Sequence, residues 1–313
     1  MEELTKKIVI PLDGSKNALK SLDYVEQMFG HEHNLNLNLI YIMPSFPPIL
    51  IDDKTIDKET YAQMASGDKK LVNKAERLLR EAKNTLIDKG FAEKRIEAIF
   101  RKKEKGIAQD VCNWADQKIV DAVLITRRGQ SDLETFFMGR VSESLVEHCT
   151  ECPVWIVSGA VDSRKVLVCL DSSDNALRAV DHAGFMLSGT DCHITILHTM
   201  RHLTRYVPME VLEDASDIQR LYKEKAGKRI APYMEKAREM LFEAGFTDEQ
   251  VTSRVVDGSR SPADDILKEA RSRGYGTIVL GRRGLSGLKA FVFGSVTKKI
   301  LHHSAGLSVW IVQ

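Results

Sequence analysis

The sequence has little of several features that mark particular classes of protein. Its 313 residues contain no apolar run near the roughly 18 residues that a membrane helix needs. Lysine and arginine number 45 against 44 acidic residues, so bulk charge does not indicate binding to nucleic acid or to an anionic membrane. Cysteine occurs five times, an odd and sparse number that favours a reducing compartment, and the short acidic lead-in before residue 8 predicts no secretion signal. We therefore expect a cytoplasmic protein that binds neither membrane nor nucleic acid.

Two common phosphate-binding motifs are also missing. There is no Gly-x4-Gly-Lys-Ser/Thr sequence, which excludes a P-loop, and no Gly-x-Gly-x-x-Gly follows a predicted strand, which argues against dinucleotide binding. What the chain does have is 43% hydrophobic and 28% charged residues. This composition and length allow each of two domains, of about 150 residues each, to bury a core of its own.

The chain repeats itself. Residues 126–157 and 281–312 align without a gap at an offset of 155, and 13 of these 32 positions are identical. Upstream, residues 8–19 match residues 166–177 at an offset of 158. Self-similarity of this kind indicates a duplicated structural unit. We predict two copies of one domain, at residues 1–158 and 164–313.

Each copy alternates short strands with amphipathic helices. The apolar run 8–12 is typical of a strand covered on both faces. Apolar residues at helical spacing predict two helices in each copy: Ala18, Leu22, Val25 and Phe29, then Leu71, Ala75, Leu78, Ala82 and Leu86, and in the second copy Ala176, Val180, Ala183 and Leu187, then Ile230, Met234, Ala237 and Leu241. Gly90 and Gly245 stand where the second helices should end. The pattern predicts an α/β fold, in which each domain has a parallel sheet with helices on both faces.

A ligand would sit beyond the carboxyl ends of the strands, where the strand order reverses. After the fourth strand of the second copy come Gly281 and Gly284, then nine residues, then Gly294 and Ser295. Glycines let backbone N–H groups approach a ligand closely, and a helix that starts at Ser295 offers its N-terminal amides to an anion. This arrangement fits a di- or triphosphate. Asp171, at the end of the first strand, would accept a hydrogen bond from a ribose hydroxyl.

The G-x2-G-x9-G-S pattern, together with an aspartate ending the first strand, resembles the universal stress protein family, and the duplication resembles its tandem members. The resemblance implies two Rossmann-like domains of the adenine nucleotide alpha hydrolase-like class, each a five-stranded parallel sheet of order 3-2-1-4-5. It also implies ATP as the ligand, with Mg²⁺ or Mn²⁺ on the phosphates. The residues that would contact the nucleotide are Leu170, Asp171, Thr199, Gly281, Arg282, Arg283, Gly284, Gly294, Ser295, Val296 and Thr297.

The first copy departs from this pattern. It keeps Asp13, Gly129 and Gly139, but Thr126 stands at the position of the first glycine and Arg140 replaces the serine. A threonine adds a branched Cβ where the backbone must approach the ligand closely. We expect this degenerate site not to bind ATP in the family's usual way. Arg140 would either grip an anion supplied by another molecule or fill the pocket itself.

Other residue groups have plainer interpretations. The arginine pairs 127–128 and 282–283 fit phosphate contacts and solvated loop charges equally well. Ser15 and Ser173 are expected to cap helices, because no repeated base accompanies them as it would a nucleophile. Cys149 and Cys152 are expected to be buried or idle thiols, since the second copy lacks both. The histidines are interpreted as surface or core residues, because no third ligand accompanies any pair of them.

The last strands of the two copies, residues 154–157 and 309–312, would lie at sheet edges. An exposed apolar edge strand invites pairing. We predict that the two copies pair along these strands with pseudo-twofold symmetry, which makes the chain an intramolecular pseudo-dimer. Whether the whole chain also forms a homodimer stays open.

These features together predict a cytoplasmic stress-response protein that holds ATP in its second domain as a structural or signalling ligand. No residue pattern sets a general base beside a water or a nucleophile, so at most slow ATP hydrolysis is expected. Two alternatives stay open: a slow adenine-nucleotide hydrolase or transferase, and a nucleotide-free scaffold that binds another small molecule or protein partners.

Overall fold

The computed structural model describes residues 5–15, 18–30, 34–51, 55–127, 140–212, 216–259, 261–282 and 294–313. In the first half the strands are β1 (Lys6–Leu12), β2 (Leu35–Met43), β3 (Ile96–Lys102), β4 (Ala122–Thr126) and β5 (Val154–Val157), and the helices are α1 (Lys20–Phe29), α2 (Pro48–Ile51), α3 (Lys58–Asp88), α4 (Ile107–Lys118) and α5 (Arg140–His148). In the second half the strands are β6 (Lys165–Cys169), β7 (His193–Met200), β8 (Val251–Asp257), β9 (Thr277–Gly281) and β10 (Ser308–Val312), and the helices are α6 (Asp174–Leu187), α7 (Met209–Leu212), α8 (Ser216–Glu243), α9 (Pro262–Ser272) and α10 (Ser295–His303).

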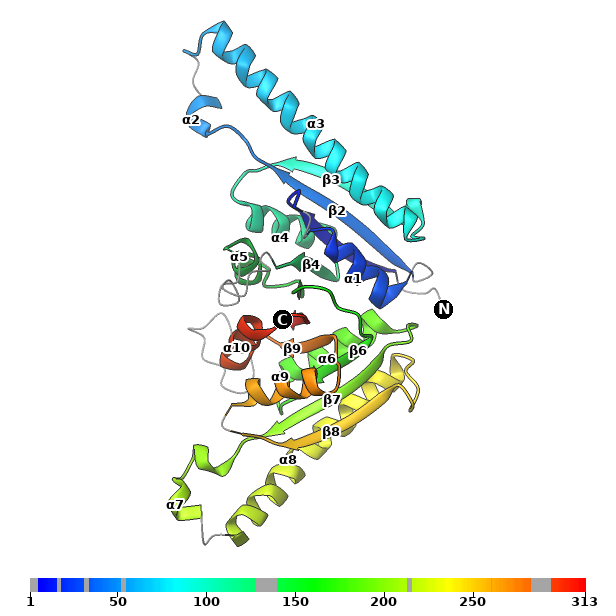
Figure 1. Ribbon diagram of the computed structural model, residues 1–313, viewed down its shortest axis with the longest axis vertical. Coiled ribbons are helices and arrows are strands. Elements are labelled where there is room, and N and C mark those ends of the chain that lie inside the picture. Colours follow the sequence, from blue (N-terminus) through cyan, green and yellow to red (C-terminus); the bar gives the residue numbers. More distant parts are fainter. Residues whose placement is uncertain are drawn as a thin grey trace.

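The ten strands form one continuous sheet in the order β3-β2-β1-β4-β5-β10-β9-β6-β7-β8 (Figure 1). Numbered within its own half, each set of five strands follows the order 3-2-1-4-5. Within each half every neighbouring pair of strands is parallel, and β5 and β10 are antiparallel to each other. The predicted α/β class and the pairing of the two last strands are confirmed.

Helices cover both faces of this sheet. One hydrophobic cluster joins one face to α1, α3, α6 and α8, and a second cluster joins the opposite face to α4, α5, α9 and α10. The apolar positions that predicted the helices lie in the first cluster, where Leu71 and Leu78 are only partly buried. Each cluster includes residues of both halves of the chain, because the sheet is unbroken between them.

A pair of tryptophans marks the pseudo-twofold axis at the joint. Trp155 on β5 and Trp310 on β10 stack with ring centroids 3.7 Å apart and an angle of 2° between their planes. Each indole N–H donates a hydrogen bond across the joint: Trp310 to the Tyr24 hydroxyl at 2.9 Å, and Trp155 to His182 Nε2 at 3.1 Å. Tyr24 and His182 lie on the equivalent helices α1 and α6. The joint therefore buries two large aromatic rings and satisfies both of their polar atoms.

The ends of the helices follow the predicted signals with one exception. Gly90 and Gly245, beyond the ends of α3 and α8, have φ of 91° and 97°, which glycine adopts without strain. Ser173 caps α6, since its hydroxyl accepts from the Ala176 amide at 3.2 Å. Ser15 accepts from the Ala18 amide in the same way, but α1 begins only at Lys20, so Ser15 stabilises the turn before the helix.

The prediction that Cys149 and Cys152 are buried is confirmed, but Cys149 is not a free thiol. This residue forms a disulfide with Cys112 of α4, across a sequence separation of 37 residues. Cys152, Cys169 and Cys192 are free. In the part of the chain that the structure describes, no helix is long and apolar enough to cross a membrane.

Candidate functional site

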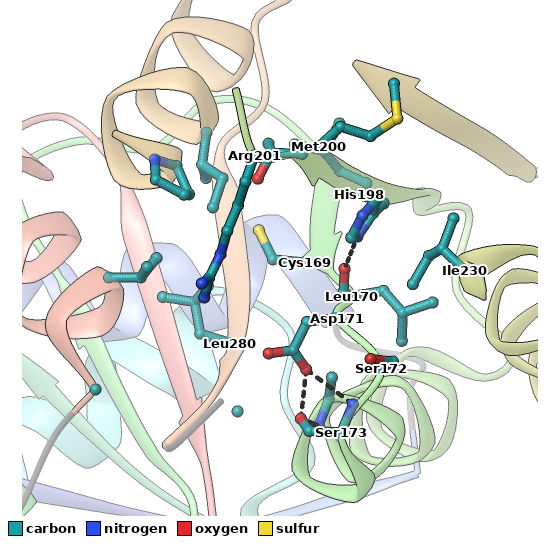
Figure 2. A pocket seen from close by; sticks show the side chains of 18 of the residues that line it. Cys169, Leu170, Asp171, Ser172, Ser173, His198, Met200, Arg201, Ile230 and Leu280 are labelled. Carbon is teal, nitrogen blue, oxygen red and sulfur yellow. Dashed lines mark hydrogen bonds between the residues drawn. The ribbon is translucent and has the colours of Figure 1, made fainter. Parts of the chain in front are cut away.

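A pocket lies at the carboxyl ends of β6, β7 and β9, in the second half of the chain. Its cavity measures about 290 Å³. The wall combines residues that follow these strands with the first turn of α10 and one side of α8 (Figure 2). Of the predicted ligand residues, the described ones that line it are Leu170, Asp171, Thr199, Gly281, Gly294, Ser295, Val296 and Thr297. The remaining predicted residues of the glycine loop, Arg283 and Gly284, lie outside the described residues.

Asp171 is fixed at the pocket by the turn that leads into α6. Its Oδ1 accepts hydrogen bonds from the backbone amide of Ser173, at 3.0 Å, and from the Ser173 hydroxyl. The Ser173 hydroxyl in turn caps α6, so the carboxylate and the helix start hold one another in place. Figure 2 shows the Asp171 carboxylate pointing into the cavity, where it can accept from a ligand hydroxyl.

The glycine at the end of β9 is required by close packing. A Cβ built on Gly281 would lie 2.8 Å from the carbonyl oxygen and 2.9 Å from the carbonyl carbon of Asn175 on α6. Both are backbone atoms, which cannot move aside as a flexible side chain would. Only glycine therefore lets β9 approach the start of α6 so closely.

The start of α10 faces the same pocket. Gly294 is its N-cap, and the Gly294 amide donates to the carbonyl of Arg282 at 3.2 Å. Thr297 donates through its hydroxyl to the carbonyl of Gly281 at 3.3 Å, which ties the first turn of the helix to the end of β9. The amides of Ser295 and Val296 belong to this first turn, where a helix has no carbonyl partners for its N–H groups. The arrangement suits a negatively charged group.

His198, on β7, also lines the pocket, although we predicted no site role for it. Its Nδ1 lies 2.8 Å from the Leu170 carbonyl, which can only accept, so Nδ1 carries the proton. Burial lowers the pKa of His198 below its usual range, which favours the neutral ring. In the neutral ring Nε2 is a hydrogen-bond acceptor. The signal that could have located His198 is its position at the end of the second strand, next to Thr199.

Aromatic and basic side chains form the outer wall of the pocket. Tyr206 and Tyr222 pack with ring centroids 6.3 Å apart, and the Tyr222 hydroxyl donates to the carbonyl of Arg201 at 2.8 Å. Arg201 and Arg229 also line the cavity, and Figure 2 shows Arg201 extended across it. Sequence patterns missed Arg201, Tyr222 and Arg229, of which the first follows β7 and the other two belong to α8.

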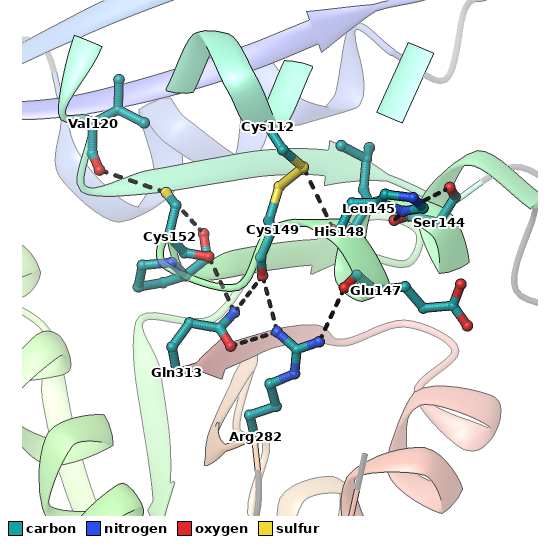
Figure 3. The surroundings of a disulfide bond; sticks show 11 residues. Cys112, Val120, Ser144, Leu145, Glu147, His148, Cys149, Cys152, Arg282 and Gln313 are labelled. Carbon is teal, nitrogen blue, oxygen red and sulfur yellow. Dashed lines mark hydrogen bonds between the residues drawn. A yellow bond between two sulfur atoms is a disulfide. The ribbon is translucent and has the colours of Figure 1, made fainter. Parts of the chain in front are cut away.

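Arg282 does not line the pocket with its side chain. The guanidinium reaches the first half of the chain, where Nη1 donates to the carbonyl of Cys149 at 3.0 Å, and the same Nη1 donates to Gln313 Oε1 of its own half at 2.6 Å (Figure 3). Nη2 donates to the carbonyl of Glu147 at 3.3 Å. Its counterpart Arg127 donates to the carbonyl of Leu301 at 3.0 Å. We interpreted Arg127 and Arg282 as phosphate contacts or solvated charges. In the structure, the side chain of each arginine instead contacts the other half of the chain.

The equivalent place in the first half is built differently. Asp13 forms the same turn as Asp171, since its Oδ1 accepts from the Ser15 amide at 2.8 Å. Leu12 is the counterpart of Leu170. The strand partner of Leu12 is Tyr41, whereas the carbonyl of Leu170 accepts a hydrogen bond from His198. Tyr41 therefore occupies the position in the first half that His198 occupies in the second. Tyr41 is 6% exposed and belongs to the core.

The remaining residues of the predicted degenerate site are only partly visible. Thr126 ends β4 and Arg140 begins α5, and the structure does not describe the Arg140 side chain. Gly129 and Gly139 lie outside the described residues. The choice between the two roles of Arg140 therefore stays a prediction.

No metal-binding cluster is found within the described ranges, where no three His, Cys, Asp or Glu side chains are grouped to hold an ion. The chemistry that the pocket offers is a fixed carboxylate, a neutral imidazole, a glycine-lined approach and a helix N-terminus.

Comparisons with known proteins agree with this architecture. The family model described as "Universal stress protein family" matches residues 5–158 and 163–313. "Universal stress protein YxiE" of Bacillus subtilis is 32% identical over 145 residues, covering 44% of this chain and 90% of that protein. "Universal stress protein MJ0531" of Methanocaldococcus jannaschii is 27% identical over 159 residues, covering 50% of this chain and 84% of that protein. The crystal structure of a universal stress protein from Archaeoglobus fulgidus has the same fold, with a TM-score of 0.63 at 19% identity over 98% of this chain and 96% of that one.

Proposed function

The chain belongs to the universal stress protein family as a tandem member, and from this premise we propose that its second domain binds ATP. The nucleotide serves as a structural or signalling ligand of a stress-response protein. The observation that carries the proposal is the meeting of three groups on one cavity: the Asp171 carboxylate, the close-packed Gly281 and the first turn of α10.

The phosphate end of the ligand fits the side of the pocket formed by Gly281 and α10. The amides of Ser295 and Val296 lie at the positive end of the helix, and an anion placed there gains about 0.3–2 kcal/mol. The lack of a Cβ at Gly281 and Gly294 leaves the backbone open to phosphate oxygens. Mg²⁺ or Mn²⁺ would travel with the phosphates, because the described residues offer it no cluster of their own.

The nucleoside end fits the side formed by β6, β7 and α8. The Asp171 carboxylate accepts from a ribose hydroxyl, and a charge-assisted bond of this kind contributes about 1.5–3 kcal/mol. The backbone of Thr199 lies at the end of β7, where it meets the base. Leu170 and Ile230 supply apolar surface around the base, and both side chains line the cavity.

We further propose that the first domain does not bind ATP in this way. Thr126 carries a Cβ at the position where Gly281 has none, and the buried Tyr41 stands in place of His198. Both changes put side-chain atoms where the second domain has open space or a polar lining. The chain would therefore hold one nucleotide.

Titration calorimetry with ATP, ADP and AMP tests this function. We expect the wild-type chain to bind one ATP, and Asp171→Asn to weaken binding about fivefold, because a neutral hydrogen bond replaces a charged one. Gly294→Val adds a branched Cβ at the anion site and should abolish binding. The matched control is Asp13→Asn, the same change in the same turn of the first domain, which should leave the affinity unchanged.

The outcome also separates the alternatives. Rapid release of ADP during the titration would favour an adenine-nucleotide hydrolase or transferase. Absence of any nucleotide effect on the wild-type chain would refute the proposal and leave a scaffold that binds another molecule. An equal loss of affinity in Asp13→Asn and Asp171→Asn would contradict the assignment to the second domain.

A further inference from the structure

The disulfide between Cys112 and Cys149 lies where the two domains meet. Cys112 is in the middle of α4, and Cys149 directly follows the last residue of α5. The bond therefore fixes the end of α5 against α4. Cys112 is 2% exposed and Cys149 is fully buried, so the cross-link is part of the core on that face of the sheet.

The backbone of Cys149 is also a contact point for the second domain. Its carbonyl accepts from Arg282 Nη1 at 3.0 Å and from Gln313 Nε2 at 2.9 Å (Figure 3). Gln313 Oε1 accepts from the same guanidinium at 2.6 Å, so the three groups form a closed set of hydrogen bonds. Any displacement of Cys149 must displace Arg282 or break these bonds.

Arg282 connects this contact to the nucleotide pocket through its backbone. It directly follows Gly281, its amide donates to the carbonyl of Val312 at 2.6 Å, and its carbonyl accepts from the amide of Gly294 at 3.2 Å. Gly281 and Gly294 both line the pocket. An unbroken series of covalent and hydrogen bonds thus runs from the disulfide to both glycines of the anion site.

The duplication shows that this connection exists in one direction only. Leu267 and Ser304 stand in the second domain at the positions of Cys112 and Cys149, so this pair cannot form a disulfide. Arg127 donates to the carbonyl of Leu301 in that domain, but no disulfide between these two positions fixes the segment that it contacts. Cys152 is not part of the pair. Its thiol donates to the carbonyl of Val120 at 3.5 Å, and burial raises its pKa to about 12, which keeps it protonated and unreactive.

We propose that Cys112 and Cys149 form a reversible redox modification site whose state sets the affinity of the second domain for its nucleotide. This inference rests on the proposed function. The reagent is a dithiol: one thiolate attacks a sulfur of the cross-link and forms a mixed disulfide, and the second thiol of the reagent displaces the protein sulfur. Two electrons and two protons pass to the protein, giving two cysteine thiols and one oxidised dithiol. A disulfide reagent reverses the exchange.

Reduction acts on the pocket by loosening the end of α5. Without the cross-link, the Cys149 carbonyl is no longer held against α4, and the Arg282 guanidinium loses a fixed acceptor. A less firmly held Arg282 allows more motion of the backbone at Gly281 and Gly294, and this motion weakens anion binding. Couplings between sites commonly change affinity by about 5–150-fold, and we expect at least ~5-fold weaker ATP binding after reduction. The buried position of both sulfurs makes reduction slow, because the reagent must wait for a local opening.

The test compares ATP binding by the full chain in its two redox states. Alkylation and mass spectrometry count the thiols: three free cysteines of the five in the oxidised chain, and five after dithiothreitol. Titration with Mg·ATP should give tighter binding in the oxidised state. Cys112→Ser/Cys149→Ser should bind as the reduced wild type does and ignore the reagent. Cys152→Ser is the matched control and should keep the full redox effect, and Arg282→Met should lose it.

Two results would overturn the inference. Equal ATP affinity in both redox states would refute the inference while leaving the proposed function intact. An undiminished redox effect in Arg282→Met would refute the connection through Arg282. If neither state binds any adenine nucleotide, the proposed function fails, and the claim that the disulfide sets nucleotide affinity fails with it. Hydrogen exchange tests the link to the pocket separately: faster exchange of the Arg282 and Gly294 amides after reduction supports the link, and unchanged exchange refutes it.

Discussion

Replacing Gly281 with alanine tests the close packing of β9 against the start of α6 at the pocket. The new Cβ would lie 2.8 Å from the Asn175 carbonyl oxygen, 2.9 Å from its carbon and 3.1 Å from the Asn175 Cβ. Ordinary carbon contacts lie at about 3.5–4.0 Å, so the end of β9 and the start of α6 must separate by roughly half an ångström. Overpacking of this kind costs about 1–3 kcal/mol of unfolding free energy.

The same separation moves the two halves of the proposed site apart. Gly281 lies on one side of the pocket, and the start of α6, with Asp171 before it, lies on the other. We therefore expect Gly281→Ala to weaken ATP binding about tenfold or more, since a misplacement of this size removes well-aligned hydrogen bonds of about 1.5 kcal/mol or more. Urea denaturation measures the stability, and titration calorimetry measures the affinity.

Gly227→Ala is the matched control. Gly227 lies inside α8, and a Cβ there meets nothing within 4 Å. In a helix interior the change from glycine to alanine gains about 0.5–1 kcal/mol. The two variants carry the same chemical change in one domain, with opposite predicted signs for stability. Wild-type stability and affinity in Gly281→Ala would refute the packing argument for the pocket.

The joint between the domains gives two further predictions. Trp310→Phe removes the indole N–H that donates to the buried Tyr24 hydroxyl, and the unfolding free energy measured in urea should fall by about 1–3 kcal/mol; no change would contradict the role of this bond. Burial lowers the pKa of His182 to about 3, so below about pH 6.5 the unfolded chain binds a proton that the folded chain does not. Stability should therefore fall by up to ~1.4 kcal/mol per pH unit from pH 6 to pH 4, and His182→Gln, which keeps an acceptor for Trp155, should remove this part of the slope.

The features predicted from the sequence are those that local patterns specify. Helical spacing placed Ile230, Met234, Ala237 and Leu241 on one buried face, because burial of a stripe requires that spacing. The duplication and the apolar edge strands predicted the pairing of β5 with β10, because an apolar edge has to be covered. The glycine pattern likewise marked the pocket wall at Gly281, where close packing leaves no room for a Cβ.

The features that were missed depend on contacts between distant segments. Arg-Arg-Gly recurs at residues 127–129 and 282–284 and predicts a loop, but two acceptors of the Arg282 guanidinium, the carbonyls of Glu147 and Cys149, belong to the other domain. Cys112 and Cys149 come together only because α4 packs against the end of α5, and no spacing of the cysteines indicates that packing. Tyr41 and His198 occupy equivalent strand ends, and only the register of each strand pair shows that one replaces the other.

The central claim is that one adenine nucleotide binds in the second domain, between Asp171 and the start of α10. A crystal structure of the chain grown with saturating Mg·ATP tests it most directly. We predict density for one nucleotide per chain, with the ribose at Asp171 and the phosphates at the amides of Ser295 and Val296. Density in the first domain alone, or a second-domain pocket filled by its own side chains, would contradict the claim.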